Sequence, residues 1–143
     1  MLSKGLVRRA RAAARATVDR LATWARSGIP IVGLEPTSVS AIRDDYRSLL
    51  PEDPDVAMLA DHVETFDEFV AKEHSKGNFH LDLNRRQQRL LLHGHCHQKA
   101  LIGNGPSRQT LSLTGAEVTE VDSGCCGMAG SFGYEAEHYD VSM

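Results

Sequence analysis

Residues 90–97 read Leu-Leu-Leu-His-Gly-His-Cys-His, and residues 117–127 read Glu-Val-Thr-Glu-Val-Asp-Ser-Gly-Cys-Cys-Gly. Residues 90–92 are an apolar strand candidate and residues 117–121 are another strand candidate, and each continues into a loop that carries cysteine. A similar run, residues 29–34, lies nearer the start of the chain. It is apolar without alternation, which indicates a strand covered on both faces. These three runs are the strand candidates of the predicted fold.

The sequence between the strand candidates has helical periodicity. Apolar side chains recur at three- and four-residue steps over residues 7–25, and this pattern stops before Gly28. A second helix is expected with Thr37 or Ser38 as its N-cap. A long helix is expected over residues 56–73. Its acidic side chains are expected on a solvated face: Asp61, Glu64, Asp67 and Glu68.

Strands that alternate with helices predict an α/β fold, with a mainly parallel sheet and flanking helices in a three-layer-like arrangement. In such a sheet the carboxyl ends of the strands meet at one edge, where functional loops gather. All three cysteines of the chain follow the second and third strand candidates: Cys96, Cys125 and Cys126. We therefore expect the two cysteine loops to lie together at this edge, within one domain that covers residues 1–143.

The composition is that of an ordinary globular protein, and it excludes several classes. The 143 residues are 41% hydrophobic and 24% charged, and no apolar run approaches the ~20 residues of a membrane span. A net charge of −3 argues against a nucleic-acid-binding protein, which is normally basic. Three cysteines are too few, and odd in number, for a disulfide-rich secreted domain, and no secretory signal is present. We therefore expect a reducing, cytoplasmic setting.

Positive charge is concentrated at the start of the chain. Residues 1–26 carry seven cations and one anion, which gives +6 and leaves −9 for the remaining residues. An arginine-rich, acid-poor amphipathic segment is typical of a mitochondrial presequence, but also of a surface helix packed through its apolar side. We favour the domain helix, because its apolar stripe is continuous and the sequence passes directly into the first strand candidate.

The cysteines are the residues most suited to chemistry. Thiolates are soft ligands for iron–sulfur clusters, zinc and copper(I). Cys125 and Cys126 lie in a Gly-Cys-Cys-Gly turn, whose glycines permit positive φ and a close approach of backbone amides to sulfur. A helix that begins just after Gly127 would also favour negative charge on the thiols. Spacing alone does not separate a ligand set from three small reduced cysteines.

Histidines flank the first cysteine at residues 93, 95 and 97. If the preceding strand continues through them, their imidazoles point to one face and Cys96 points to the other. His95 and His97 are therefore candidate metal-site residues, either as ligands of a zinc ion or as groups around a metal. The sequence has no CxxC spacing, which would identify a zinc site more specifically.

Three strings together point to one family: Gly33-Leu34-Glu35-Pro36, His93-Gly94-His95-Cys96-His97, and the segment from Asp122 to Gly133 that contains GCCGMAGSFG. They resemble the cysteine-rich CCG domain of heterodisulfide reductase. This domain also occurs in the iron–sulfur subunits of glycolate oxidase and anaerobic glycerol-3-phosphate dehydrogenase, and in fused FAD-linked oxidases. The resemblance is strongest to the C-terminal region of fused D-lactate or D-2-hydroxyacid dehydrogenases, and it covers nearly the whole chain.

This resemblance implies an electron-transfer function in an oxidoreductase. In the family, FAD oxidises a 2-hydroxy acid such as D-lactate or glycolate, and iron–sulfur centres of the 4Fe–4S type pass electrons to a quinone or another redox protein. It implies that Cys96, Cys125 and Cys126 are cluster ligands, with His95 and His97 close by. The FAD would belong to an adjoining domain or a partner subunit. The location would be cytoplasmic, or peripheral at the inner membrane face.

Two departures from the family pattern limit what this chain does alone. Ser38 stands where relatives commonly have a ligand cysteine, and no fourth cysteine follows Cys126. The resemblance therefore implies a piece of a larger protein, with an incomplete ligand set and no activity by itself. Two other interpretations stay open: a zinc-binding or thiol-redox module, and a non-catalytic interaction module with vestigial cysteines.

Overall fold

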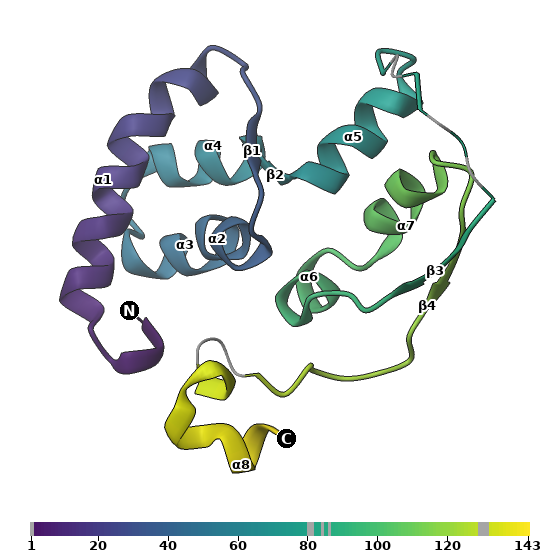
Figure 1. Cartoon of the computed structure of the whole chain (residues 1–143). Coiled ribbons are helices and arrows are strands. Elements are labelled where there is room, and N and C mark those ends of the chain that lie inside the picture. Colours follow the sequence, from purple (N-terminus) through teal and green to yellow (C-terminus); the bar gives the residue numbers. More distant parts are fainter. Residues whose placement is uncertain (1, 80–81, 84, 86, 129–131) are drawn as a thin grey trace. The chain divides into compact units, whose positions relative to one another are not determined.

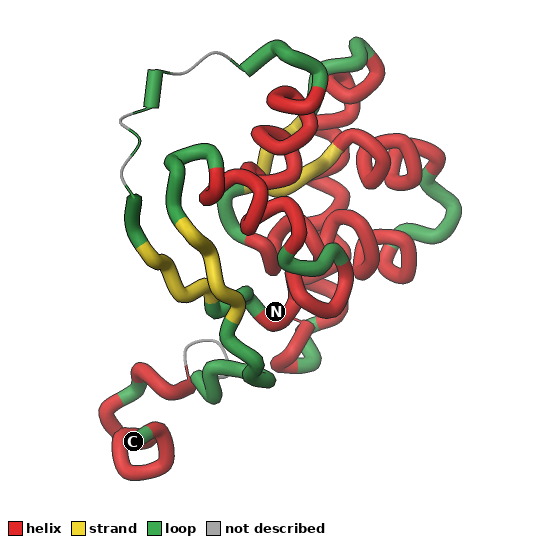
Figure 2. Tube along the Cα trace, turned by 90° about the vertical axis from the view of Figure 1, so that its right-hand side faces the viewer, coloured by secondary structure: helices red, strands yellow, loops and turns green. Residues whose placement is uncertain are grey.

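The structure is a computed structural model, and it describes residues 2–79, 82–83, 85, 87–128 and 132–143. The chain divides into two units, Met1–Leu81 and Asp82–Met143. Each unit combines helices with one pair of short parallel strands (Figures 1 and 2), so the predicted α/β class with parallel strands is confirmed. The pairing is distributed over two two-stranded sheets, β1–β2 in the first unit and β3–β4 in the second.

The Met1–Leu81 unit places helices around the first strand pair. Its elements in chain order are η1 (Leu2–Lys4), α1 (Val7–Arg26), β1 (Ile31–Gly33), α2 (Pro36–Ser40), η2 (Ala41–Asp45), α3 (Tyr46–Leu49), α4 (Pro54–His62), β2 (Val63–Thr65) and α5 (Phe66–Ser75). Strands β1 and β2 pair with Ile31 opposite Val63 and Gly33 opposite Thr65. Helix α1 packs against α4, as Figure 1 shows.

The core of this unit lies against α1. The helix ends where the sequence predicts, and Gly28 adopts a φ of +73° just beyond it. One stripe of α1 is buried against Leu59 of α4, which is fully buried. The α1 residues of this core are Ala14, Val18, Ala22 and Ala25. Their other buried partners are Val39, Ile42, Leu50, Val56 and Val63. Burial of a continuous stripe is what the domain-helix interpretation predicts.

The predicted helix over residues 56–73 is wrong in one respect, because strand β2 interrupts it between α4 and α5. Thr65 begins α5 with a capping box. The amide of Glu68 donates to the Thr65 hydroxyl, and the amide of Thr65 donates to the Glu68 carboxylate at 2.8 Å. This reciprocal pair satisfies amides that the first turn of a helix leaves free, so a new helix starts there.

The expectation of a solvated acidic face is also wrong for part of this region. Glu64 lies on β2 and is buried, and its two carboxylate oxygens accept hydrogen bonds from Lys72 Nζ at 2.5 and 2.6 Å. Glu68 is half-buried and pairs with Arg43 at 3.0 Å. The strand breaks the helical periodicity on which the expectation depended, so Glu64 faces the interior rather than solvent.

The helix that follows the first strand is present, but its predicted N-cap is wrong. Glu35 is the N-cap, since its carboxylate accepts from the amides of Thr37 at 2.9 Å and Ser38 at 2.6 Å. The hydroxyl of Ser38 donates to the same carboxylate at 2.8 Å. Pro36 occupies the start of the helix, where a missing N–H costs nothing, and the longer Glu35 side chain reaches the exposed amides.

The Asp82–Met143 unit contains the second strand pair. Its elements are β3 (Arg89–Leu92), α6 (Cys96–Leu101), α7 (Gly105–Ser112), β4 (Glu117–Glu120), η3 (Phe132–Tyr134), η4 (Ala136–His138) and α8 (Tyr139–Ser142). Strands β3 and β4 run parallel, with Arg89 opposite Glu117 and Leu92 opposite Glu120, and they lie side by side in Figures 1 and 2. The amide of Val121 donates to the carbonyl of Leu92 at 2.9 Å. Both strands therefore end at the same edge.

Candidate functional site

The predicted meeting of the two cysteine loops is confirmed within the second unit. Cys96 is the first residue of α6, which follows β3, and Cys125 and Cys126 lie in the loop that follows β4. All three are free thiols and exposed. The side chains of Cys96 and Cys126 both interact with the Cys125 thiol and contribute to its lowered pKa. Three sulfurs from two distant parts of the sequence are thus gathered at one edge of the β3–β4 pair.

Cys125 is the electrostatically distinct member of this group. The amide of Gly127 donates to its Sγ at 3.4 Å, and this hydrogen bond is the largest cause that lowers the pKa of the Cys125 thiol. Partial desolvation opposes the effect, and contacts with Cys126 and Cys96 add to it. Gly127 has a φ of +81°, as the predicted role of the flanking glycine requires, so its amide can turn back toward the sulfur.

The helix expected directly after Gly127 does not begin there. Met128 is not helical, and residues 129–131 lie outside the described part of the chain. The next helical turn is η3, which begins at Phe132. The lowered pKa of Cys125 therefore comes first from the Gly127 amide, with smaller contributions from the side chain and amide of Cys126 and from the side chain of Cys96, and not from the end of a helix at Gly127.

The alternation predicted for the histidines is wrong, because β3 ends at Leu92 and α6 begins at Cys96. His95 is the N-cap residue of α6 and His97 lies in its first turn. Both are exposed, and their rings meet edge to face with centroids 5.6 Å apart. The two histidines are therefore neighbours of Cys96 in the chain and of each other in space, and their part in a metal site stays a prediction.

Buried polar contacts fix the scaffold beneath the cysteine edge. Gln98 on α6 donates to the hydroxyl of Ser107 on α7 at 2.6 Å, and both side chains are buried. Asn104 is buried and donates to the carboxylate of Glu120 at the end of β4. A Cβ added at Gly94 would lie 2.0 Å from Asn104 Oδ1, so only glycine fits this approach. These contacts join α6, α7 and β4 into one support.

Lys99 is the functional candidate that sequence reasoning missed. Its Nζ donates to the carbonyl oxygens of Ser123 and Gly124, at 2.7 Å for Gly124, so α6 is tied to the loop that carries the cysteine pair. The signal in the sequence was its position one turn after Cys96, which places both residues on neighbouring parts of one helix face. Helix periodicity alone does not reveal that a loop lies opposite.

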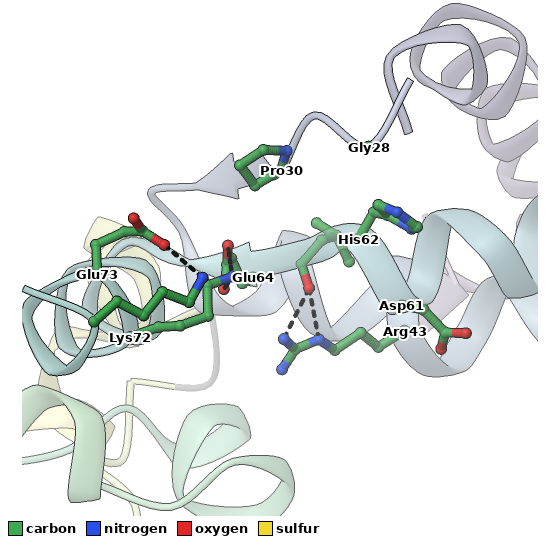
Figure 3. A pocket seen from close by; sticks show the side chains of 10 residues that line it. Gly28, Pro30, Arg43, Asp61, His62, Glu64, Lys72 and Glu73 are labelled. Carbon is green, nitrogen blue, oxygen red and sulfur yellow. Dashed lines mark hydrogen bonds and ion pairs between the residues drawn. The ribbon is translucent and has the colours of Figure 1, made fainter. Parts of the chain in front are cut away.

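A hollow lies in the first unit, around β2 (Figure 3). Its walls include Pro30 and His62 together with charged side chains. These charged side chains already have partners within the chain. Lys72 pairs with Glu64, and the guanidinium of Arg43 donates to the backbone carbonyl of Val63 at 2.8 and 3.0 Å. A ligand would have to displace these contacts, so we interpret the hollow as part of the scaffold.

Two features are absent from the described part of the chain. No group of three or more His, Cys, Asp or Glu side chains in the described ranges has the arrangement of a metal site. None of the helices in the described parts combines the length and the apolar character that a membrane crossing requires.

Comparison with known proteins finds relatives among dehydrogenases. The chain is 32% identical over 120 residues to a subunit of the anaerobic glycerol-3-phosphate dehydrogenase of Escherichia coli (strain K12), a match that covers 81% of this chain and 29% of the relative. It is also 29% identical over 151 aligned residues to the D-2-hydroxyglutarate dehydrogenase of Pantoea ananatis, and 28% identical over 144 residues to the one of Escherichia coli (strain K12). Both matches cover 98% of this chain and 13% of the relative. The chain thus spans less than a third of each of these relatives.

No family model matches the chain, and no solved structure matches it significantly.

Proposed function

We propose that this chain is an electron-transfer region of a larger oxidoreductase that oxidises a 2-hydroxy acid such as D-lactate or glycolate. Residues 1–143 would form one cysteine-rich region of the CCG type. FAD would be bound by an adjoining domain or a partner subunit, and electrons would pass onward to a quinone or another redox protein. The similarity to dehydrogenases supports the class of reaction.

The observation that carries the proposal is that Cys96, Cys125 and Cys126 follow the paired strands β3 and β4 at one edge, although among the described residues their side chains are not arranged as a preformed metal site. Soft thiolates from two loops are the donor set that iron–sulfur clusters use. The Gly127 amide is directed at the Cys125 sulfur, and such N–H···S hydrogen bonds tune the potential of a bound cluster. A cluster bound here would accept and release single electrons.

The ligand set of this chain supplies three thiols, and the sequence contains no fourth cysteine. The fourth ligand would therefore come from a non-cysteine residue or from outside these 143 residues. His95 and His97 lie next to Cys96 in the sequence and are the neighbouring groups to test.

The test is an iron and acid-labile sulfide assay on the full-length protein that contains this chain, purified without oxygen. We expect iron and sulfide together with visible absorption, and a loss of most of the iron in Cys96→Ser, Cys125→Ser and Cys126→Ser. His138→Gln is the matched control, because His138 lies in the same unit, where it stacks on Phe132.

Other outcomes would contradict the proposal in distinguishable ways. Stoichiometric zinc without visible absorption, lost in His95→Gln or His97→Gln, would support a zinc module instead. Absence of any metal, with reversible oxidation of the thiols, would support a thiol-redox module. Unchanged stability and electron transfer in the double variant Cys125→Ser/Cys126→Ser would support an interaction module with vestigial cysteines.

A further inference from the structure

Lys99 connects the two cysteine segments through the backbone. It lies on α6, one turn after Cys96, and its ammonium donates to the carbonyl oxygens of Ser123 and Gly124. These are the two residues directly before Cys125. A hydrogen bond from a charged donor is roughly twice as strong as one between neutral groups. The Lys99 side chain is also half-buried, which restricts the positions that its ammonium can occupy.

Besides Lys99 and the interaction of Cys96 with Cys125, the polar contact found in the described part of the unit between this loop and the segment that leads into α6 is weak. His93 and Ser123 approach at 3.4 Å, which is at the long limit of a hydrogen bond. The amide of Ser123 bonds within its own segment, to the carbonyl of Val121. Gly124 and Gly127 have open space around them, so side-chain packing does not fix the loop at those positions.

We propose that Lys99 is a positioning residue that sets the separation between the thiol of Cys96 and the thiol of Cys125. The role of these thiols as ligands rests on the proposed function, but the positioning itself is a property of this chain. It predicts that loss of the ammonium lets the loop move away from α6, while the adjacent pair Cys125 and Cys126 stays together because one peptide bond joins the two residues.

Dibromobimane, which becomes fluorescent when it joins two nearby thiols, tests this in the reduced chain without any metal. In a Cys126→Ser background the reagent can only join Cys96 to Cys125, and Lys99→Met is expected to slow this cross-link about tenfold, the cost of about one charged hydrogen bond. In a Cys96→Ser background it can only join Cys125 to Cys126, and Lys99→Met is expected to change the rate less than twofold.

Three further variants make the result specific. Lys99→Arg keeps a charged donor of similar reach and should retain at least half of the Cys96–Cys125 rate. Lys99→Gln has a shorter, neutral donor and should behave like Lys99→Met, so it serves if Lys99→Met fails to fold by circular dichroism. Arg108→Met removes an exposed cation of the same unit and should have no effect.

An unchanged Cys96–Cys125 rate in folded Lys99→Met or Lys99→Gln would overturn the proposal. So would an equal loss in both backgrounds, since that would indicate a change in thiol reactivity rather than in their separation. The cross-linking assay contains no iron, so a negative cross-linking result bears on the role of Lys99 and not on whether the protein binds a cluster. Absence of iron in the full-length protein would remove the cluster while leaving the positioning result intact.

Discussion

Replacing Glu35 with glutamine should destabilise the protein at neutral pH and have little effect near pH 2. The carboxylate accepts from the amides of Thr37 and Ser38 at the start of α2, and from the Ser38 hydroxyl. Partial desolvation opposes the charged form, but these hydrogen bonds outweigh it and lower the pKa of Glu35 from 4.5 to about 2. Glutamine keeps one neutral acceptor, so it loses the charge and part of the hydrogen bonding.

The expected magnitude is set by the exposure of this side chain. Without solvent screening, this lowering of the Glu35 pKa would correspond to about 3 kcal/mol of stabilisation. Glu35 is exposed, however, and solvent screens its interactions strongly. Helix N-caps are typically worth about 0.5–2 kcal/mol, so we expect Glu35→Gln to lower the free energy of unfolding by about 1 kcal/mol at pH 7.

The pH dependence follows from the direction of the pKa change. Because the folded state lowers the pKa of Glu35, its stabilisation is present above pH 4.5 and is lost as the pH falls toward 2. The difference in unfolding free energy between wild type and Glu35→Gln should therefore shrink over this window. Urea unfolding of the full chain, followed by circular dichroism at several pH values, measures this difference.

Glu52→Gln is the control for this experiment. Like Glu35, Glu52 is an exposed carboxylate, but among the described residues no group donates a hydrogen bond to its side chain. It should change stability by less than about 0.5 kcal/mol at every pH. An NMR titration of the Glu35 carboxyl gives a reading that does not depend on unfolding. A pKa near 4.5 for Glu35, or a Glu35→Gln effect that is equal at pH 7 and pH 2.5, would refute the reasoning.

Three further changes test the scaffold. Leu59→Ala removes a fully buried side chain and should lower the free energy of unfolding by about 2–5 kcal/mol, measured by urea unfolding. Lys72→Met leaves the buried Glu64 carboxylate without its cation and should cost about 1–3 kcal/mol, which Glu64→Gln in the same chain should partly restore in a double-mutant cycle. Gly94→Ala would place a Cβ 2.0 Å from Asn104 Oδ1 and should cost about 1–3 kcal/mol, seen as a lower Tm with the other scaffold contacts intact.

Local sequence signals could predict the long helix and three of the four strands, but not β2, which breaks the predicted helix between α4 and α5. The α1 stripe repeats over many turns, so its periodicity is a strong signal. Apolar residues continue at helical spacing through β2, and periodicity alone therefore favours one helix. The capping-box spacing of Thr65 and Glu68 was present as an opposing signal. The chain forms a strand and a new helix there because Val63 also pairs with Ile31 of β1, and this contact cannot be read from a local sequence pattern.

The histidine segment could not be predicted from alternation for a related reason. After Leu92 the peptide leaves the strand, and Gly94 passes close to the buried Asn104 at the start of α7, a contact that alternation does not contain. The N-cap of α2 in the first unit, Glu35, also could not be predicted from local sequence preferences. Ser and Thr are usual N-caps, but the register of Pro36 at the first helical position gives this role to a longer acidic side chain.

The meeting of the cysteines was predictable because it follows from topology and not from side-chain detail. The crossover from β3 through α6 and α7 returns the chain to a parallel β4, so the segments that follow the two strands share one edge. Cys96 and Cys125 are 29 residues apart in the sequence, yet this constraint alone brings them near each other. The final approach of their sulfurs depends on contacts to backbone atoms, from Lys99 to two carbonyls and from the Gly127 amide to Cys125. A sequence pattern can thus identify the edge at which the thiols gather, whereas their separation is set by contacts that only the folded chain contains.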